Sequence, residues 1–300
     1  MTRPIPGPDP NPHTPTLKAP PKACDCHNHV FGPAARFPYS PERLYTPPDA
    51  PLDDFLRMLG ILGIERAVIV QPSVYGSDNG CTEDAIARMA GRARGVAVVD
   101  PGIGAHELKR LDAAGFRGLR FNLIHTGGST SLDALESLAA KAASIDWHAQ
   151  IYLRGGILPD IEARLQALPV PLVIDHLGHM DENQGTEQLG FRSLLRLVEA
   201  GRTWVKLCPY RFDYSGFPYP KAQPFARALA AVAPQRLVWG TDWPHPDIGG
   251  PGPEARGPMP NDGDLLDALG VWFEDEALIR RILVDNPADL YRFDARPLGA

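Results

Sequence analysis

The sequence predicts a (β/α)8 barrel, an α/β fold in a single domain, and two observations support that prediction. Eight short runs rich in Val, Ile and Leu recur between residues 23 and 242. They are too continuously apolar for strands with one face in water, and strands of a parallel sheet covered by helices have this composition. Segments with apolar residues at helical spacing separate the runs, so strand–helix units follow one another over about 270 residues.

The elements can be assigned in order along the chain. The predicted strands lie at 23–30, 66–72, 95–101, 116–123, 148–154, 171–178, 203–209 and 236–242. Helical spacing is clear in 52–63, where apolar residues occupy positions 52, 55, 56, 59 and 62. Further amphipathic segments occupy 81–93, 105–115, 131–144, 157–168, 189–201, 224–233 and 264–273. A doubly wound open sheet is the rival fold, and it is weakened because no Gly-rich phosphate-binding sequence follows the first strand.

Proline and glycine are unusually frequent, with 32 and 29 of the 300 residues. Eight of the prolines fall within residues 1–21, where large apolar side chains are almost lacking. Such a stretch buries too little surface to offset the ordering of its backbone. We therefore predict a polyproline-like arm over 1–22, a barrel over 23–293 and a tail over 294–300.

Charge and cysteine content exclude several classes of protein. The 30 Lys and Arg against 36 Asp and Glu residues give a net charge of −6 without a basic run, which argues against a nucleic-acid partner. No apolar stretch approaches the ~20 residues that span a bilayer, and the N-terminus lacks the apolar segment of a secretory signal. Four cysteines make no disulfide framework in a chain of this length. We expect a cytoplasmic protein without a membrane partner, either a monomer or a homo-oligomer.

Polar residues stand at the ends of the apolar predicted strands, where a barrel gathers its catalytic groups. His27 and His29 end the first strand, and alternate residues of a strand project to one side, so both imidazoles can point into one site. His176 ends the sixth strand and Asp242 the eighth. Three histidines and a carboxylate at one barrel mouth suit a divalent metal or acid–base chemistry. Other strand-end polar residues, not assigned to the site, include Arg154, Asp175 and Lys206.

Several longer motifs carry a family resemblance. DCHNHVFGP, QPSVYGSDN, RGLRFN, DHLG, GTDWPHP and DNPADLYRF resemble the amidohydrolase superfamily (amidohydrolase-related family 2) and, within it, the 2-pyrone-4,6-dicarboxylate lactonase branch. The resemblance covers roughly residues 23–293. It implies that Asp242 is the general base toward water and that His27, His29 and His176 polarise a lactone carbonyl. It also implies that the substrate and its carboxylates are held by Tyr45, Ser73, Arg120, Tyr152 and Arg211.

The chain departs from that branch at three positions near the expected mouth. The sequence IHTGG at 124–128 lacks an arginine of the branch, His179 replaces a second arginine, and Asp247 replaces an asparagine. His179 and Asp247 therefore join the predicted substrate-binding residues. Two cations lost and one anion gained predict a related carboxylated lactone or cyclic ester of aromatic-acid or sugar-acid catabolism, with fewer or differently placed carboxylates.

The resemblance implies a hydrolase that requires no cofactor, because the pyrone lactonases work without metal. The alternative is one divalent ion, Zn²⁺, held by the three histidines and Asp242. A binuclear centre is not expected, because Arg120 and Tyr152 stand at strand ends that supply its further ligands. Two other functions remain open: a mononuclear-zinc decarboxylase or hydrolase of the same superfamily, and a non-catalytic barrel that binds a small acid. The expected partner in each case is a small anionic molecule.

Overall fold

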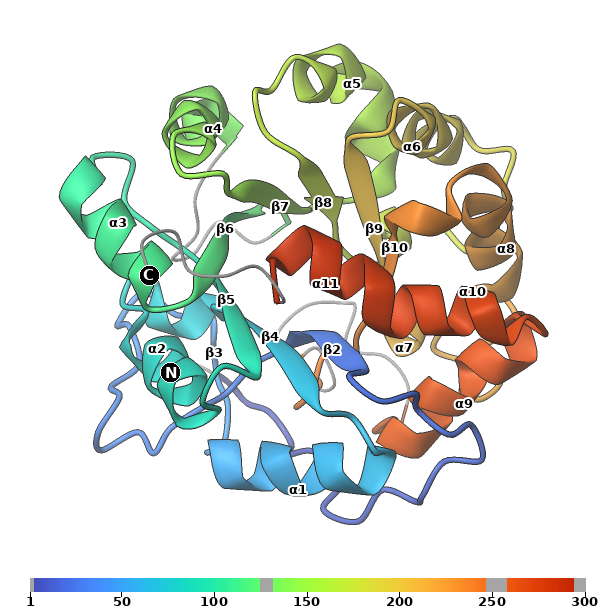
Figure 1. Cartoon of the computed structure of the whole chain (residues 1–300), viewed down its shortest axis with the longest axis horizontal. Helices are drawn as coiled ribbons and strands as arrows, with labels where there is room; N and C mark the ends of the chain where they lie inside the picture. Colours follow the sequence, from blue (N-terminus) through green and yellow to red (C-terminus); the bar gives the residue numbers. More distant parts are fainter. Residues whose placement is uncertain (1–2, 125–131, 247–257, 294–300) are drawn as a thin grey trace.

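The structure, a computed structural model, describes residues 3–124, 132–246 and 258–293. Within these residues eight parallel strands form one sheet that curls into a barrel with helices outside it (Figure 1). Each strand pairs with the next, which confirms the predicted fold. The strands are β2 (Cys24–Asn28), β4 (Arg66–Val70), β5 (Ala93–Ala97), β6 (Phe116–Asn122), β7 (His148–Tyr152), β8 (Leu172–Ile174), β9 (Thr203–Leu207) and β10 (Leu237–Trp239).

The barrel closes where β2 meets the segment that follows β10. The backbone N–H of Asp242 donates a 2.7 Å hydrogen bond to the carbonyl oxygen of His27, and the N–H of His29 donates at 2.7 Å to the carbonyl of Trp243. These two bonds continue the parallel pairing across the gap between the first and last strands. Closure therefore sets the backbone of His27 and His29 directly beside that of Asp242.

Helices cover the outside of the barrel, and eight of the described helices fall on the predicted segments. In α1, for example, the side chains of Leu52, Phe55, Leu59 and Leu62 form the buried face, as the spacing predicts. The predicted helices are α1 (Leu52–Leu62), α2 (Gly80–Arg88), α3 (Ala105–Ala113), α4 (Leu135–Ala143), α5 (Leu158–Gln166), α6 (Leu189–Glu199), α8 (Gln223–Val232) and α9 (Asp262–Trp272). The sequence did not predict α7 (Pro209–Phe212), α10 (Glu276–Arg280) or α11 (Asn286–Tyr291).

The apolar core has two parts. The larger lies between the sheet and the helices, and the smaller fills the barrel interior, where Cys24 and Cys26 pack with valines of the other strands and with Tyr291 of α11. All four cysteines are buried and free. Because α11 crosses the amino end of the barrel (Figure 1), the carboxyl ends of the strands form the opposite mouth.

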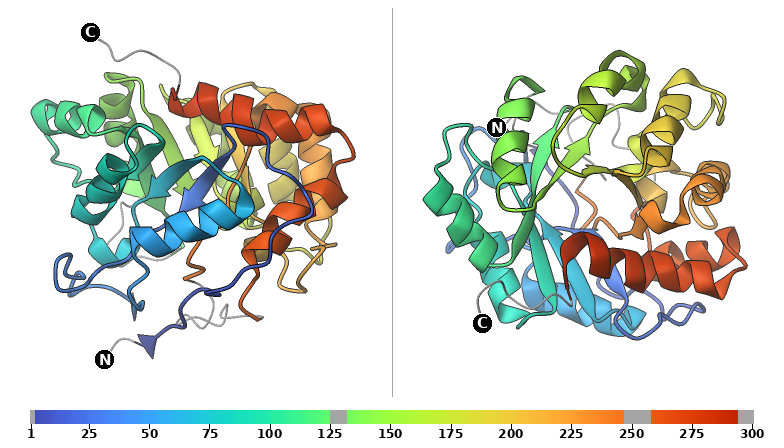
Figure 2. Two further views of the ribbon diagram at one scale, coloured as in Figure 1. Left: turned by 60° about the horizontal axis from the view of Figure 1, so that its bottom comes forward. Right: turned by 45° about the horizontal axis from the view of Figure 1, so that its top comes forward.

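The N-terminal residues run along the outside of α9 (Figure 2). The backbone N–H of Leu17 donates a 2.7 Å hydrogen bond to the carboxylate of Asp267 in that helix. The described part of this segment begins with β1 (Arg3–Pro4), which pairs in parallel with β3 (Tyr45–Thr46). The division into arm, barrel and tail stays a prediction, and the tail at 294–300 lies outside the described residues.

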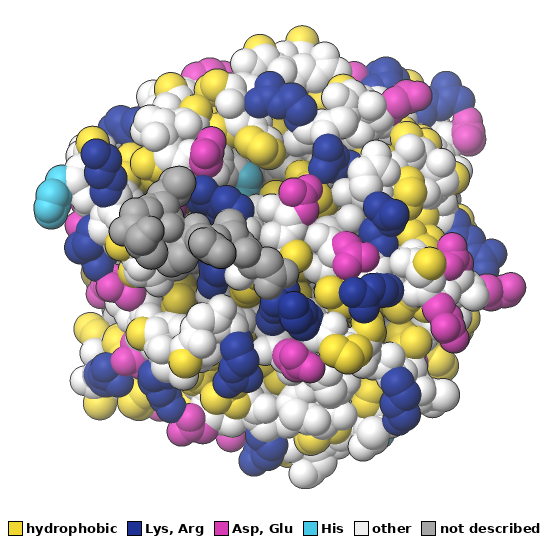
Figure 3. All heavy atoms as spheres, viewed as in Figure 1, with side chains coloured by type: hydrophobic (Ala, Val, Ile, Leu, Met, Phe, Trp, Pro, Cys, Tyr) yellow, Lys and Arg dark blue, Asp and Glu magenta, His cyan; other side chains and the backbone are white. Residues whose placement is uncertain are grey.

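The surface at the α11 end mixes Lys and Arg with Asp and Glu side chains (Figure 3). None of the helices in the described part of the chain combines the length and the apolar composition that crossing a bilayer requires.

Candidate active site

The four predicted catalytic side chains meet at the carboxyl end of the barrel. Nε2 of His27 lies 3.4 Å, and Nε2 of His29 lies 3.2 Å, from Oδ1 of Asp242. The rings of His27 and His176 are 4.5 Å apart between centroids. All four residues are at most 2% exposed. Strand ends far apart in the sequence thus place three imidazoles and one carboxylate in a single water-shielded cluster.

Asp242 presents its two carboxylate oxygens to different partners. Oδ1 faces the histidines, whereas Oδ2 accepts a 2.5 Å hydrogen bond from the hydroxyl of Tyr210 and lies 3.3 Å from Nε of Arg211. Burial alone would raise the pKa of Asp242, but the Arg211 guanidinium beside it holds that pKa well below its ordinary value. Asp242 is therefore a carboxylate with one oxygen fixed and the other aimed at the cluster.

The histidines of the cluster are neutral at physiological pH. Burial lowers the pKa of His27 to about 3 and also lowers the pKa values of His29 and His176. Nδ1 of His29 lies 2.7 Å from the carbonyl oxygen of Val70. Because a carbonyl only accepts, Nδ1 carries the proton of the neutral ring and Nε2 is left as an acceptor.

The same geometry tests whether a metal fits. Nε2 of His29 and Oδ1 of Asp242 are both acceptors and face each other at 3.2 Å, so a proton or a cation has to lie between them. Oδ1 of Asp242 and Nε2 of His27 find no hydrogen-bond partner within the described residues. Two overlapping groups could hold a divalent ion: His27, His29 and Asp242, or His27, Asp175 and His176. The donors present fit one divalent cation.

A second layer of buried polar side chains lies behind His27. Oδ1 of Asp175 and Nζ of Lys206 lie 3.2 Å and 3.3 Å from its Nδ1. Gln150 joins the two, accepting from Lys206 at 2.7 Å and donating to Asp175 at 3.1 Å. These three side chains are fully buried, and together they fix the orientation of the His27 ring.

Sequence analysis did not assign that layer, or Tyr210, to the site. Gln150 carries a usable signal, because it stands two residues before Tyr152 on β7 and so projects to the same side. Lys206 interrupts an otherwise apolar strand, which signals a buried partner. Tyr210 lies in the short helix α7 directly before Arg211, and only the tertiary arrangement brings its hydroxyl to Asp242.

The predicted substrate-binding residues Arg120, Tyr152 and Arg211 lie together beside the cluster. Arg211 donates a 2.7 Å hydrogen bond to the hydroxyl of Tyr152. The guanidinium carbons of Arg211 and Arg120 are 5.2 Å and 6.0 Å from the centre of the Tyr152 ring. Arg120 also donates to the backbone carbonyl of Gln71 at 3.0 Å. Two cations thus border one aromatic ring next to Asp242.

Tyr45 and Ser73 come to the site from two further loops. Burial raises the pKa of the Tyr45 phenol, and Ser73, Arg120 and Asp242 lie close enough to act on it. The structure therefore brings both residues to the margin of the cluster. Asp247, the remaining predicted position, lies outside the described residues.

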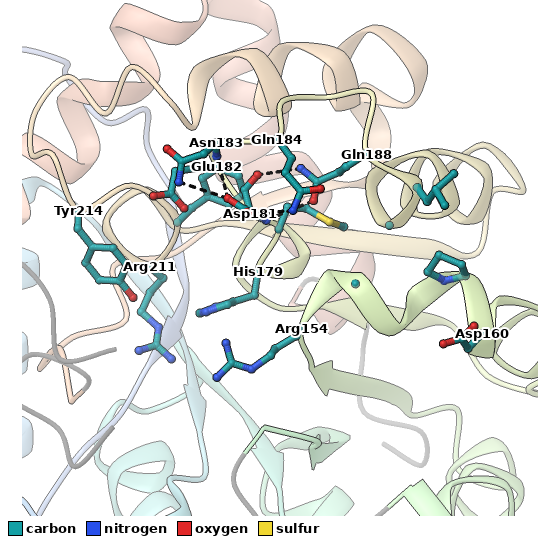
Figure 4. A pocket seen from close by; sticks show the side chains of 16 residues that line it. Arg154, Asp160, His179, Asp181, Glu182, Asn183, Gln184, Gln188, Arg211 and Tyr214 are labelled. Atoms are coloured by element: carbon teal, nitrogen blue, oxygen red, sulfur yellow. Dashed lines mark hydrogen bonds between the residues drawn. The ribbon is translucent and has the colours of Figure 1, made fainter. Parts of the chain in front are cut away.

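A cavity of about 950 Å³ opens next to the cluster, between the loops after β7 and β8 and helix α7. Arg154 and His179 lie side by side on its wall and extend toward Arg211 (Figure 4). The backbone N–H of Gly155 donates to the carbonyl of His179 at 3.3 Å. A Cβ atom on Gly155 would collide with the sulfur of Met180, so the two loops pack together closely. The fold therefore fixes Arg154 beside His179.

Comparisons with known proteins agree with this architecture. A family model described as Amidohydrolase matches residues 24–293. A 4-sulfomuconolactone hydrolase of Rhizobium radiobacter is 40% identical over 272 residues, 90% of this chain and 89% of that protein. A 2-pyrone-4,6-dicarboxylate hydrolase of Comamonas testosteroni is 38% identical over 295 residues, 94% and 93% of the two chains. A solved apo structure from Agrobacterium tumefaciens is 31% identical with a TM-score of 0.81, over 93% of this chain and 98% of that one.

A more distant solved structure is an amidohydrolase of Burkholderia multivorans with bound zinc. It shares the fold, with a TM-score of 0.67 at 19% identity over 90% of this chain and 99% of that chain. The family match, by contrast, spans the whole barrel and includes the histidine cluster. The chain belongs to the amidohydrolase family.

Proposed function

We propose that this protein hydrolyses a small lactone that carries an acidic group, with Asp242 as the general base toward water. The observation that carries the proposal is the position of Asp242, whose Oδ1 faces His27 and His29 while Tyr210 and Arg211 hold Oδ2. Two relatives named as lactone hydrolases, 40% and 38% identical over nine-tenths of the chain, support it.

The proposed reaction uses the chain's own groups. Oδ1 of Asp242 takes a proton from water while the water oxygen adds to the lactone carbonyl carbon. The carbonyl oxygen takes up the displaced electron pair and is stabilised by imidazole N–H groups, among them that of His176, whose ring nitrogens have no partner within the described residues. The electron pair on that oxygen then re-forms the carbonyl double bond and the ring C–O bond breaks. The leaving ring oxygen takes the proton from Asp242.

Arg211 links substrate binding to this step. Its guanidinium holds the pKa of Asp242 low, which makes the carboxylate a weak base in the absence of substrate. An acidic group of the substrate that contacts the same guanidinium partly neutralises its positive charge, and so weakens its effect on the pKa of Asp242. The carboxylate then becomes a stronger base once substrate is bound.

We propose that the predicted substrate-binding residues act in two groups. One group borders the lactone ring and is made up of Tyr45, Ser73, Arg120 and Tyr152. The other receives the acidic group and consists of His179, Arg211 and, as an addition to the sequence prediction, Arg154 on the same cavity wall. Arg154 supplies a cation beside His179, so the acidic group of the substrate is a carboxylate or a sulfonate that reaches this cavity. Asp247 stays a predicted contact.

We also propose that turnover requires no metal, since the residues themselves supply a base and hydrogen-bond donors. The alternative is one Zn²⁺ held by His27, His29 and Asp242, with His176 as a further ligand. When bound, such an ion would polarise the carbonyl and acidify a water molecule. Activity that persists after chelation and metal analysis supports the proposal. Activity that is lost and returns with Zn²⁺ alone overturns it.

The proposal is tested with a panel of lactones and one catalytic variant. The panel contains 4-sulfomuconolactone, 2-pyrone-4,6-dicarboxylate and an uncharged lactone. We expect turnover of an acidic lactone, a fall in kcat of about 10²–10⁴-fold in Asp242→Asn with ligand still bound, and no such fall in the control Asp289→Asn, an exposed aspartate on α11 at the opposite end of the barrel. Release of CO₂ would indicate a decarboxylase instead. Ligand binding without turnover by the unaltered protein would indicate a binding barrel.

Arg154 has its own test within the same panel. We expect Arg154→Ala to raise KM for the acidic lactone about 10-fold or more and to leave the uncharged lactone unaffected. Arg192→Ala, an exposed arginine on α6 outside the cavity lining, is the matched control. Equal effects of Arg154→Ala on charged and uncharged lactones would remove Arg154 from the acid-binding group.

Efficient turnover of the pyrone dicarboxylate itself would contradict the expectation of fewer or differently placed carboxylates.

A further inference from the structure

Residues 3–22, here called the arm, are fixed to helix α9 by specific contacts. The backbone N–H of His13 donates a 3.2 Å hydrogen bond to the side chain of Asn261, and that of Leu17 donates at 2.7 Å to Asp267. Pro12 and Pro15 are buried. Their spacing of three residues matches one turn of a polyproline helix, so one edge of the arm faces the protein. The arm is thus held along its length rather than only at its ends.

The fit between the arm and α9 is close at Gly263, in the first turn of that helix. A Cβ atom on Gly263 would lie 2.5 Å from the carbonyl oxygen of His13 and 2.7 Å from its Nε2. Glycine weakens a helix by about 1 kcal/mol relative to alanine. The glycine at this position is therefore explained by the arm, because any side chain would push the backbone of His13 away.

The far end of the arm reaches the active site through Tyr45. In the described residues, β3 (Tyr45–Thr46) pairs with β1 of the arm and lies outside the eight-stranded sheet. The backbone N–H of Ile5 also contacts the carbonyl of Thr46 at 3.4 Å, and the Ile5 side chain is 7% exposed. The arm therefore supplies the strand pairing of the backbone that carries Tyr45.

The Tyr45 side chain points from this small sheet into the site. Ser73, Arg120 and Asp242 all lie close enough to the Tyr45 phenol to influence its pKa. A shift of β3 moves Tyr45 relative to Ser73 and Arg120. The same arm therefore makes both the contacts with α9 and the strand pairing with β3, the strand that carries Tyr45.

We propose that the arm is a positioning element of the active site, which holds Tyr45 against the substrate and so sets the KM of the reaction. This inference rests on the proposed function, in which Tyr45 contacts the substrate. The arm touches no reacting atom and acts through β3 alone. Detachment of the arm from α9 weakens substrate binding and leaves the base Asp242 in place.

The test uses two full-length variants that make the same change on one helix. Gly263→Ala places its methyl group against His13, whereas Gly270→Ala meets only the Leu17 side chain at ordinary contact, 3.8 Å. In hydrogen–deuterium exchange we expect Gly263→Ala to speed exchange in peptides 3–17 and 40–50, and Gly270→Ala to match the unaltered protein. Faster exchange in 3–17 without a change in 40–50 overturns the link to Tyr45, and this result does not depend on turnover.

Kinetics supply the second readout. We expect Gly263→Ala to raise KM for the acidic lactone about 10-fold with kcat within about 3-fold, because the loss is that of one substrate contact. In a Tyr45→Ala background the same change should raise KM no further, since the contact is already gone. A fall in kcat at unchanged KM would locate the effect elsewhere in α9, where Asp262 contacts His245, and would overturn the proposal. An unaltered protein that opens no lactone would refute the proposed function while the exchange result still stands.

Discussion

Thr241 and Asp25 join the end of the last strand to the first through a 2.6 Å hydrogen bond from hydroxyl to carboxylate. The backbone N–H of Thr241 donates to the same carboxylate at 3.1 Å, and the N–H of His27 does so at 3.0 Å. One buried carboxylate therefore holds both sides of the barrel closure. Since Asp242 directly follows Thr241 and His27 itself bonds to Asp25, the closure and the catalytic geometry depend on the same contacts.

Thr241→Val is expected to lower both stability and activity. Valine keeps the shape of threonine but leaves Asp25 without one donor, which costs about 1–3 kcal/mol for a buried group. The thermal midpoint should fall by several degrees, and kcat should fall because the spacing of His27 and Asp242 is no longer fixed. Thr203→Val, a buried change at the first residue of β9 and so at the amino end of the barrel, is the control for stability alone. Equal kcat values in the two variants would contradict the link between closure and catalysis.

Tyr210→Phe isolates the hydrogen bond to the proposed base. The hydroxyl of Tyr210 donates at 2.5 Å to Oδ2 of Asp242, and hydrogen bonds to charged groups contribute about 1.5–3 kcal/mol. We expect kcat to fall about 10–150-fold with little change in KM, measured by steady-state hydrolysis of the acidic lactone. Tyr39→Phe, which alters a half-buried phenol packed against Tyr75, should leave kcat unchanged. A Tyr210→Phe protein with a normal kcat would exclude a role for this bond in orienting Asp242.

The sequence predicted the barrel and its central cluster because both follow from local patterns. Continuous apolar runs locate the strands closely, and the predicted starts at 66, 148 and 203 are those of β4, β7 and β9. The polar residues that end such runs converge in any closed parallel barrel. His27, His29, His176 and Asp242 could therefore be named before any contact was known.

The remaining features depend on contacts between distant residues. Lys206 interrupts an apolar strand, which signals a buried partner, but nothing local identifies that partner as His27, 179 residues away. The composition of the arm predicts little burial, yet Leu17 bonds to Asp267, 250 residues further along the chain. Strand β8 is shorter than predicted because the backbone turns at His176, which adopts a φ of 51° and so carries its ring into the cluster.

His148 makes a contribution to the free energy of unfolding that decreases as the pH falls. It is buried at the start of β7, with its ring 5.4 Å from that of Tyr291. Burial lowers its pKa from 6.5 to about 3, so the unfolded chain takes up a proton below pH 6.5 that the folded chain excludes. This contribution is fully present above pH 6.5 and is lost as the pH falls toward 3, at about 1.4 kcal/mol per pH unit.

His148→Asn should therefore flatten the loss of stability in acid. Between pH 7 and 5 its free energy of unfolding should fall by about 2 kcal/mol less than that of the unaltered protein, as measured by denaturant titration. His106→Asn, at an exposed histidine on α3, should leave the slope unchanged. Parallel slopes for His148→Asn and the unaltered protein would mean that His148 is not excluded from protonation in the fold.

The buried charges behind His27 are expected to depend on each other for stability. Nζ of Lys206 lies 3.7 Å from Oδ1 of Asp175, and both side chains are fully buried. Lys206→Met leaves Asp175 as a buried charge without its cation, and Asp175→Asn leaves Lys206 without its anion. Each single change should cost about 3–5 kcal/mol, because an uncompensated buried charge is strongly destabilising.

The double variant should cost less than the sum of the single changes, since it removes the cation and the anion together. We expect a coupling of about 1.5–3 kcal/mol from free energies of unfolding, with kcat reduced in all three variants because the His27 ring loses its supports. The matched cycle is Arg164→Ala with Glu136→Ala, an ion pair on the surface, for which the coupling should stay below about 1 kcal/mol. Additive costs at Lys206 and Asp175 would show that the two charges are held by other groups, such as Gln150, which contacts both.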